Sequence, residues 1–136
     1  MTLLDAYALV AFLAGGPGAR EVRSLLRTGS AAIATANLAE ALDVAERVYG
    51  LRVTRAAEVL EPLMGAPLAP IPLDLARAQR AAELRARHYH RSSRPISLAD
   101  AILIASAAAG DRIATPDPHV LAVAGAEGIG TLSLPS

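Results

Sequence analysis

Four acidic residues, Asp5, Glu40, Asp100 and Asp117, each lie at the predicted start of a helix, just after an apolar or Pro-containing segment. Carboxylate oxygens are the ligands that Mg²⁺ and Mn²⁺ prefer, and a metal site of this kind hydrolyses phosphodiesters through a metal-activated water without a protein nucleophile. Grouped together, the four acids would therefore suit divalent metal chemistry. Whether they are grouped depends on the elements that carry them.

Each acid also has a simpler structural explanation. Asp5 and Asp117 are suited to be N-cap residues, and Pro118 fits the first helical position after Asp117. Glu40 follows Asn37, and Asp100 follows Ser97, at the spacing of a capping box. Helix capping alone explains any one of these residues, but it does not explain why four capped helix starts would meet.

The surrounding sequence alternates short apolar runs with longer helical patterns, which predicts an α/β fold with a mostly parallel sheet. The predicted strands cover residues 3–4, 31–34, 68–71, 112–115 and 131–134. The predicted helices cover residues 6–13, 19–28, 38–49, 53–63, 75–90, 98–109 and 119–124. The hairpin of helices around Gly50 carries apolar residues that suit either the core or a partner helix. We see no linker, so residues 1–136 are expected to form one domain.

A parallel sheet brings the starts of the following helices to one edge, and ligands bind there where the strand order reverses. If the first and fourth strands flank that point, Asp5 and Asp117 face each other, with Glu40 and Asp100 on either side. Such carboxylates repel each other, and a bound cation removes the conflict. Thr115, at the end of a strand, is placed to hydrogen-bond a carboxylate or a metal-bound water.

Composition excludes several other functions. The chain has no Cys, and all 13 basic residues are Arg, so disulfides, thiolate sites, a Walker A lysine and a Schiff-base lysine are absent. The first 13 residues contain Asp5 and no basic segment, so they resemble neither a signal peptide nor a membrane span, and a cytoplasmic location without membrane association is expected. Net charge is zero, so nucleic acid binding must depend on local clusters.

One such cluster precedes the segment that carries Asp100. It contains Arg85, Arg87, Arg91 and Arg94. Guanidinium groups form bidentate contacts with phosphate, so these residues are candidates to guide an RNA backbone toward the acids. A solvated helix face is the alternative explanation. The nearby His88 and His90 lack the spacing of a zinc site.

Four motifs in order resemble the PIN-domain ribonucleases, and in particular the VapC toxins of type II toxin–antitoxin modules. They are LLDAYALVAFL at Asp5, ATANLAEAL at Glu40, SLADAILIASA at Asp100 and IATPDPHVLAVA at Asp117. The resemblance spans the whole chain. It implies a PIN-like three-layer sandwich in which helices flank a parallel five-stranded sheet of order 3-2-1-4-5.

The resemblance also implies an endoribonuclease that depends on Mg²⁺ or Mn²⁺, with Asp5, Glu40, Asp100 and Asp117 as metal-binding catalytic acids and Thr115 supporting them. It implies a VapB-type antitoxin partner and a homodimer. The antitoxin is expected to lie across residues 38–63 and to reach a basic group into the acidic pocket. Val120 and Pro118 depart from residues common in the family, which affects the RNA-facing rim rather than the metal ligands.

Two other functions remain open on the sequence. One is a noncatalytic PIN-like scaffold that binds RNA or protein and keeps the acids only as caps. The other is a DNA nuclease with the same chemistry, since no residue reads a 2′-hydroxyl.

Overall fold

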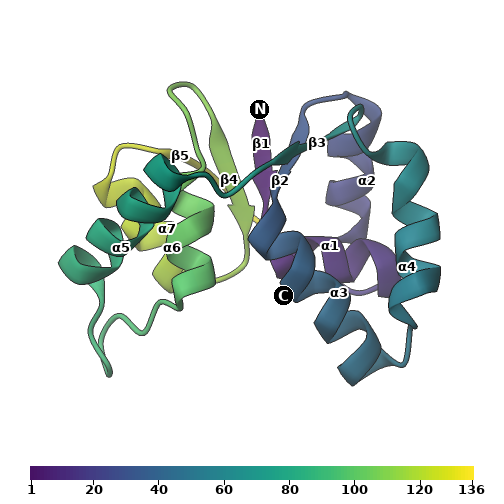
Figure 1. Cartoon of the computed structure of the whole chain (residues 1–136), viewed down its shortest axis with the longest axis horizontal. Helices are drawn as coiled ribbons and strands as arrows, with labels where there is room; N and C mark the ends of the chain where they lie inside the picture. Colours follow the sequence, from purple (N-terminus) through teal and green to yellow (C-terminus); the bar gives the residue numbers. More distant parts are fainter.

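A computed structural model describes residues 1–136. Its centre is a sheet of five parallel strands, in the order β3-β2-β1-β4-β5 (Figure 1). The strands are β1 (Thr2–Leu4), β2 (Ala31–Ala34), β3 (Leu68–Ile71), β4 (Arg112–Thr115) and β5 (Gly130–Ser133). The α/β class and the strand order are thus as expected from the sequence.

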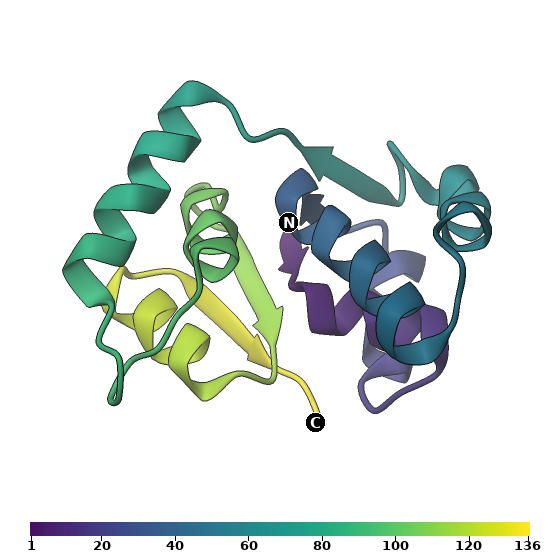
Figure 2. The same cartoon turned by 60° about the horizontal axis from the view of Figure 1, so that its bottom comes forward.

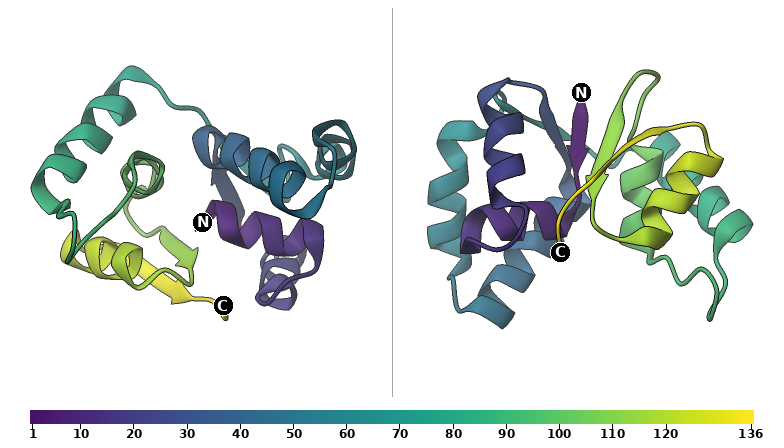
Figure 3. Two further views of the ribbon diagram at one scale, coloured as in Figure 1. Left: turned by 90° about the horizontal axis from the view of Figure 1, so that it is seen from below. Right: turned by 180° about the vertical axis from the view of Figure 1, so that it is seen from behind.

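Seven α-helices cover the two faces of the sheet, which makes three layers (Figures 1 and 3). On one side lie α1 (Ala6–Ala14), α2 (Ala19–Arg27), α3 (Thr35–Tyr49) and α4 (Val53–Leu60). On the other lie α5 (Leu75–His88), α6 (Leu98–Ala105) and α7 (Pro118–Ala126). Figure 2 shows the chain leaving β3 and crossing to α5 on the other side of the sheet.

Alternation along the strands divides the buried residues into two cores. Leu3 and Ile113 pack with α5, α6 and α7, whereas their neighbours Leu4 and Ala114 pack with α1 and α2. Successive side chains of a strand point to opposite faces, so a strand buried on both sides must be apolar throughout. This is why β2, which is buried throughout, appears in the sequence as a continuous apolar run rather than as an alternating pattern.

Helix boundaries differ from the predicted ones at several ends. Helix α4 stops at Leu60, and a 3-10 turn continues over Glu61–Leu63, where Pro62 lies. Helix α6 ends at Ala105, because the cap at Ser106 closes the last turn and its Oγ donates to the Ile102 carbonyl at 2.7 Å. None of the helices has both the length and the apolar character needed to cross a membrane.

Candidate active site

All four predicted acids line one pocket at the carboxyl edge of the sheet. The cavity has a volume of about 340 Å³, and Asp5, Glu40, Asp100 and Asp117 belong to its walls. Asp5, Asp100 and Asp117 lie at the starts of α1, α6 and α7, and Glu40 lies on α3. Strands β1 and β4 are hydrogen-bonded neighbours, so the chain order reverses between them and their ends open onto the same space.

Asp5 is the most enclosed of the four acids, with 9% of its surface exposed. Its Oδ1 accepts from the Ala8 N–H at 2.7 Å, which caps α1, and its Oδ2 accepts from the Thr115 hydroxyl at 2.5 Å. The pKa of Asp5 is raised to about 6, because the effect of burial and, to a smaller extent, of the Asp100 and Asp117 carboxylates outweighs the two hydrogen bonds, which lower it. The site thus holds a carboxylate that is costly to ionise without a cation.

Thr115 joins the two strand-end acids. Besides donating to Asp5, its hydroxyl oxygen accepts from the Asp117 backbone N–H at 3.1 Å. Asp117 is the N-cap of α7, with Oδ1 accepting from the His119 N–H at 2.8 Å, and Pro118 occupies the first helical position. The predicted cap is confirmed, and the placement of Thr115 beside Asp5 agrees with its expected position.

Asp100 lies in the capping box expected from the sequence. Its Oδ2 accepts from the Ser97 N–H at 2.8 Å, while the Ser97 Oγ accepts from the Asp100 N–H at 3.0 Å. Burial raises the pKa of Asp100, although the backbone and the side chain of Ser97 lower it through hydrogen bonds to the carboxyl group, and the Asp117 carboxylate adds to the rise. The box therefore fixes the carboxylate at the pocket wall.

The capping box predicted for Asn37 and Glu40 is wrong. Helix α3 begins at Thr35, directly from β2, with Ala34 as an N-cap that has no capping side chain. The helical pattern at 38–49 missed this first turn because its residues are short and weakly patterned. Glu40 instead lies in the second turn, at the exposed edge of the pocket, where partial burial and then Asp100 raise its pKa.

Asn37 is a pocket residue that the sequence presented only as a cap. It is 1% exposed, and its Nδ2 donates to the Ala99 carbonyl at 3.2 Å, which ties α3 to the start of α6. Its Oδ1 is buried without a hydrogen-bond partner. A polar residue just ahead of an acid, in a segment that is otherwise apolar, was the signal available in the sequence.

The carboxylates do not form a ready-made metal cage. No group of three or more His, Asp or Glu side chains is close enough to enclose an ion. Asp5, Asp100 and Asp117 each accept instead from a backbone N–H group at a helix start. The donor set nevertheless fits Mg²⁺ or Mn²⁺, since Mg²⁺ keeps several waters and binds through one or two carboxylates. Three raised carboxyl pKa values and the unpaired Asn37 Oδ1 agree with this fit.

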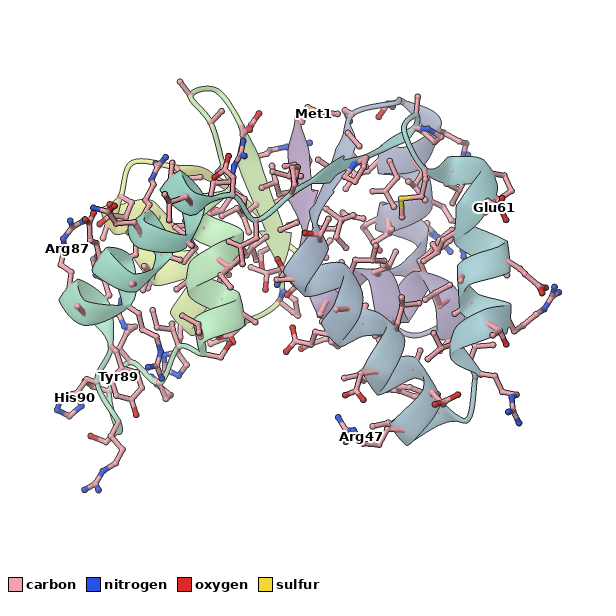
Figure 4. The ribbon with its side chains drawn as sticks, viewed as in Figure 1. Met1, Arg47, Glu61, Arg87, Tyr89 and His90 are labelled. Carbon is pink, nitrogen blue, oxygen red and sulfur yellow. The ribbon has the colours of Figure 1, made fainter.

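The four predicted RNA-binding arginines have different surroundings. Arg87 pairs with Glu127 at 2.8 Å. Figure 4 shows Arg87 on the outer side of α5. The Arg85 guanidinium donates to the Ile96 carbonyl at 3.1 Å and stacks over the Tyr89 ring, 4.3 Å from its centre. Arg91 and Arg94 lie in the turn between α5 and α6, and no hydrogen bond or ion pair holds their side chains. Of the four, only Arg91 and Arg94 can bind a ligand without breaking a contact within the protein.

The chain belongs to the PIN domain family. The family model matches residues 2–130, which is nearly the whole chain and includes all four acids and Thr115. None of the curated proteins compared with the chain matches it.

Solved structures with the same fold come from toxin–antitoxin complexes. A chain of DNA-bound VapBC from Salmonella typhimurium superposes with a TM-score of 0.71 at 21% identity, and the match covers 97% of this chain and 96% of that one. A chain of FitAcB from Neisseria gonorrhoeae has a TM-score of 0.67 at 23% identity, over 98% and 97%. A toxin–antitoxin complex from Klebsiella pneumoniae gives 0.64 at 21%, over 90% and 91%. At these identities the likeness concerns the fold.

Proposed function

We propose that this PIN domain is the toxin of a type II toxin–antitoxin pair and acts as an endoribonuclease that depends on Mg²⁺ or Mn²⁺. The observation that carries the proposal is the meeting of Asp5, Glu40, Asp100 and Asp117 in one pocket at the β1–β4 edge. The toxin–antitoxin complexes that share the fold support the biological role.

In this proposal Asp5, Asp100 and Asp117 would hold the cation, one or two of them directly and the others through its bound waters, and Glu40 completes the acidic wall from the exposed edge. When bound, the cation supplies charge neutralisation at a phosphate oxygen and lowers the pKa of an attacking water. Thr115 keeps the Asp5 carboxylate in place and favours its ionised form. Asn37 fixes the distance between α3 and α6 and leaves an acceptor oxygen beside the carboxylates.

RNA would reach the pocket along the turn between α5 and α6. Arg91 and Arg94 have no internal partners, so they can neutralise phosphates without losing a contact within the protein. Arg85 can contact RNA in part, because its guanidinium stacks on the Tyr89 ring and the pair presents both a charged and an aromatic group. Arg87 contributes least, since Glu127 already neutralises it.

An apolar groove between α3 and α4 is the proposed site of the antitoxin. Its cavity of about 560 Å³ is lined by Leu38, Leu42, Ala57, Leu60 and Met64, with Glu58 and Glu61 at the border. An amphipathic segment with basic flanks fits such a surface, and its end can carry a basic group toward the acidic pocket. Crosslinks between the antitoxin and residues 38–63 are expected, whereas crosslinks found only on α5, α6 and α7 would reject this placement.

The activity is tested with purified protein and a structured RNA. Cleavage should require Mg²⁺ or Mn²⁺, stop with EDTA and be lost in Asp100→Asn. The matched control is Asp74→Asn, because Asp74 also caps a helix, accepting from the Arg77 N–H at 2.8 Å, but lies outside the pocket. Cleavage that survives in Asp100→Asn, or that is lost equally in Asp74→Asn, would reject the assignment.

A noncatalytic scaffold is the second candidate, and the capping contacts of Asp5, Asp100 and Asp117 favour it. Under that function the Asp100→Asn variant would bind RNA as well as the parent, and neither would cut it. Matched RNA and DNA hairpins in the same assay separate a ribonuclease from a DNA nuclease.

We further propose that residues 1–136 act as one domain and that the chain forms a homodimer. The two cores share a single sheet, which supports one domain. Light scattering on the purified chain should give twice the mass of 14.0 kDa, and the mass of one chain would exclude the dimer.

A further inference from the structure

The acidic pocket has a second, uncharged end. Besides the carboxylates and Asn37, its wall contains Tyr7, Val10, Val44 and Tyr49. A smaller cavity of about 70 Å³ continues from there and shares Tyr7, Val10 and Tyr49 with it, so the two cavities adjoin. One hollow therefore runs from the carboxylates to a wall made of two tyrosines and aliphatic side chains.

Helices α1 and α3, which pack on each other, place the two ends relative to one another. Tyr7 follows Asp5 by two residues on α1, and Tyr49 ends the helix that carries Glu40. The Cα atoms of Glu40 and Tyr49 are separated by about 13 Å along the helix axis. Because helical side chains lean toward the N-terminus, the Tyr49 ring extends from its Cα back toward the carboxylates.

The chemistry of the second end suits a neutral, planar group. No Arg or His lines either cavity, so nothing there would hold a second phosphate. Tyr49 keeps 60% of its surface exposed, while the Tyr7 hydroxyl donates to the Pro135 carbonyl at 3.4 Å, which orients its ring. Aromatic side chains in this setting stack on unpaired nucleobases, and every base offers a π face.

We propose that Tyr49 stacks a nucleobase that flanks the phosphate held at the acidic end, with Tyr7, Val10 and Val44 forming the wall beside it. This inference depends on the proposed function, because it assumes that the pocket receives RNA. It narrows the substrate to RNA that is single-stranded next to the cleaved bond, since a paired base cannot leave its stack to enter the hollow without an energetic cost.

Binding measurements test the subsite separately from catalysis. The protein carries Asp100→Asn to prevent cleavage, and the probe is a short unstructured RNA with a fluorescent label, read by anisotropy in Mg²⁺. A companion set of probes has one base at a time removed. The variants are Tyr49→Ala, Tyr49→Phe and, as the matched control, Leu75→Ala, because Leu75 is another exposed apolar side chain at a helix end and does not line the hollow.

Tyr49→Ala should weaken binding by about 5- to 150-fold, the loss expected for one base–aromatic stack. Tyr49→Phe should bind close to the parent, because the ring remains. Removing the stacked base from the RNA should weaken binding by the parent by the same factor as Tyr49→Ala does on the intact probe. On that base-free probe, Tyr49→Ala should weaken binding no further.

Other outcomes would overturn the subsite. Unchanged binding in Tyr49→Ala would do so, as would an equal loss on intact and base-free probes, which would place Tyr49 in a protein contact or in the fold. RNA binding that depends on Tyr49 without any cleavage by the parent would keep the subsite and reject the nuclease. Cleavage by the parent with no role for Tyr49 would keep the nuclease and reject the subsite. A chain that neither binds nor cuts RNA would reject both the subsite and the nuclease.

Discussion

Replacing Thr115 with Val removes the hydroxyl that donates to Asp5 while keeping the volume of a fully buried side chain. A hydrogen bond to a charged group is worth about 1.5–3 kcal/mol, and 1.36 kcal/mol corresponds to one pKa unit. The hydroxyl lowers the pKa of Asp5, which is about 6, so its loss raises that pKa further. Metal ions compete with protons for the carboxylate, so the acid limb of activity should move up by about 1 to 2 pH units.

The assay is the pH dependence of RNA cleavage at a fixed, subsaturating Mn²⁺ concentration. On the acid side, Thr115→Val should be about 10- to 100-fold slower than the parent, and the two should converge at alkaline pH, where Asp5 is ionised in both. Thr115→Ser is the matched control, because it keeps the hydroxyl and should follow the parent.

Thr115→Val also leaves the Asp117 N–H without its acceptor, which costs about 1–3 kcal/mol of stability. Urea unfolding separates this loss from the effect on activity, since a stability effect lowers the whole profile without moving it along the pH axis. An acid limb that coincides in the Val variant and the parent would refute the role of the Thr115–Asp5 contact.

Three further predictions concern Asp5, Ser97 and Arg91. The pKa of Asp5 in the folded protein is raised from 3.8 to about 6, mainly by burial, so the metal-free protein should gain stability as the pH falls from 7 through 6 toward 4. At pH 7.5, urea unfolding of Asp5→Asn should give a free energy of unfolding that exceeds that of the parent by at most about 3 kcal/mol. Ser97→Ala should lose about 1 kcal/mol in urea unfolding because the α6 capping box is broken, whereas Ser93→Ala, with no side-chain contact, should not; equal stability of the two variants would argue against the box. Arg91→Ala should weaken RNA binding and reduce the slope of log affinity against log salt by about 0.7, while Arg87→Ala, already paired with Glu127, should leave that slope unchanged; a reversed result would place the RNA on the outer side of α5.

Much of the fold could be predicted from the sequence because buried parallel strands leave a simple pattern. The predicted strands at 31–34, 68–71 and 112–115 agree with β2, β3 and β4, since each has a short apolar stretch bounded by polar, Gly or Pro residues. The strand order came from the family resemblance rather than from the strands themselves. No pattern within a strand determines which strand lies beside it.

The start of α3 was missed for a different reason. The N-cap residue, Ala34, has no capping side chain, and Thr35 and Ala36 add little helical periodicity, because β2 runs into the helix without a turn. As a result Asn37 was interpreted as a cap, although it is a buried residue that contacts Ala99 across the pocket. Its role depends on the packing of α3 against the start of α6, 62 residues further along the chain. The polar residue ahead of Glu40 is visible in the sequence, but nothing local indicates that it is buried.

Gathering of the acids was predictable, but their arrangement was not. Three of them lie at helix starts, as expected, and they meet because β1 and β4 are neighbours. The backbone contacts that turn each carboxylate toward its own helix depend on side-chain torsions that sequence spacing does not determine. The apolar end with Tyr7 and Tyr49 was likewise missed, since the two tyrosines are 42 positions apart on different helices.

The central claim is that the four-acid pocket cuts RNA in the cell. The most direct measurement is to induce the chain in a bacterial host and to map new RNA ends across total cellular RNA, with Asp5→Asn as the control, because Asn keeps an acceptor for the Ala8 N–H that caps α1. We predict that a defined set of new ends accumulates with the parent and is absent with Asp5→Asn at equal protein levels. The same ends in both, or none in either, would contradict the account.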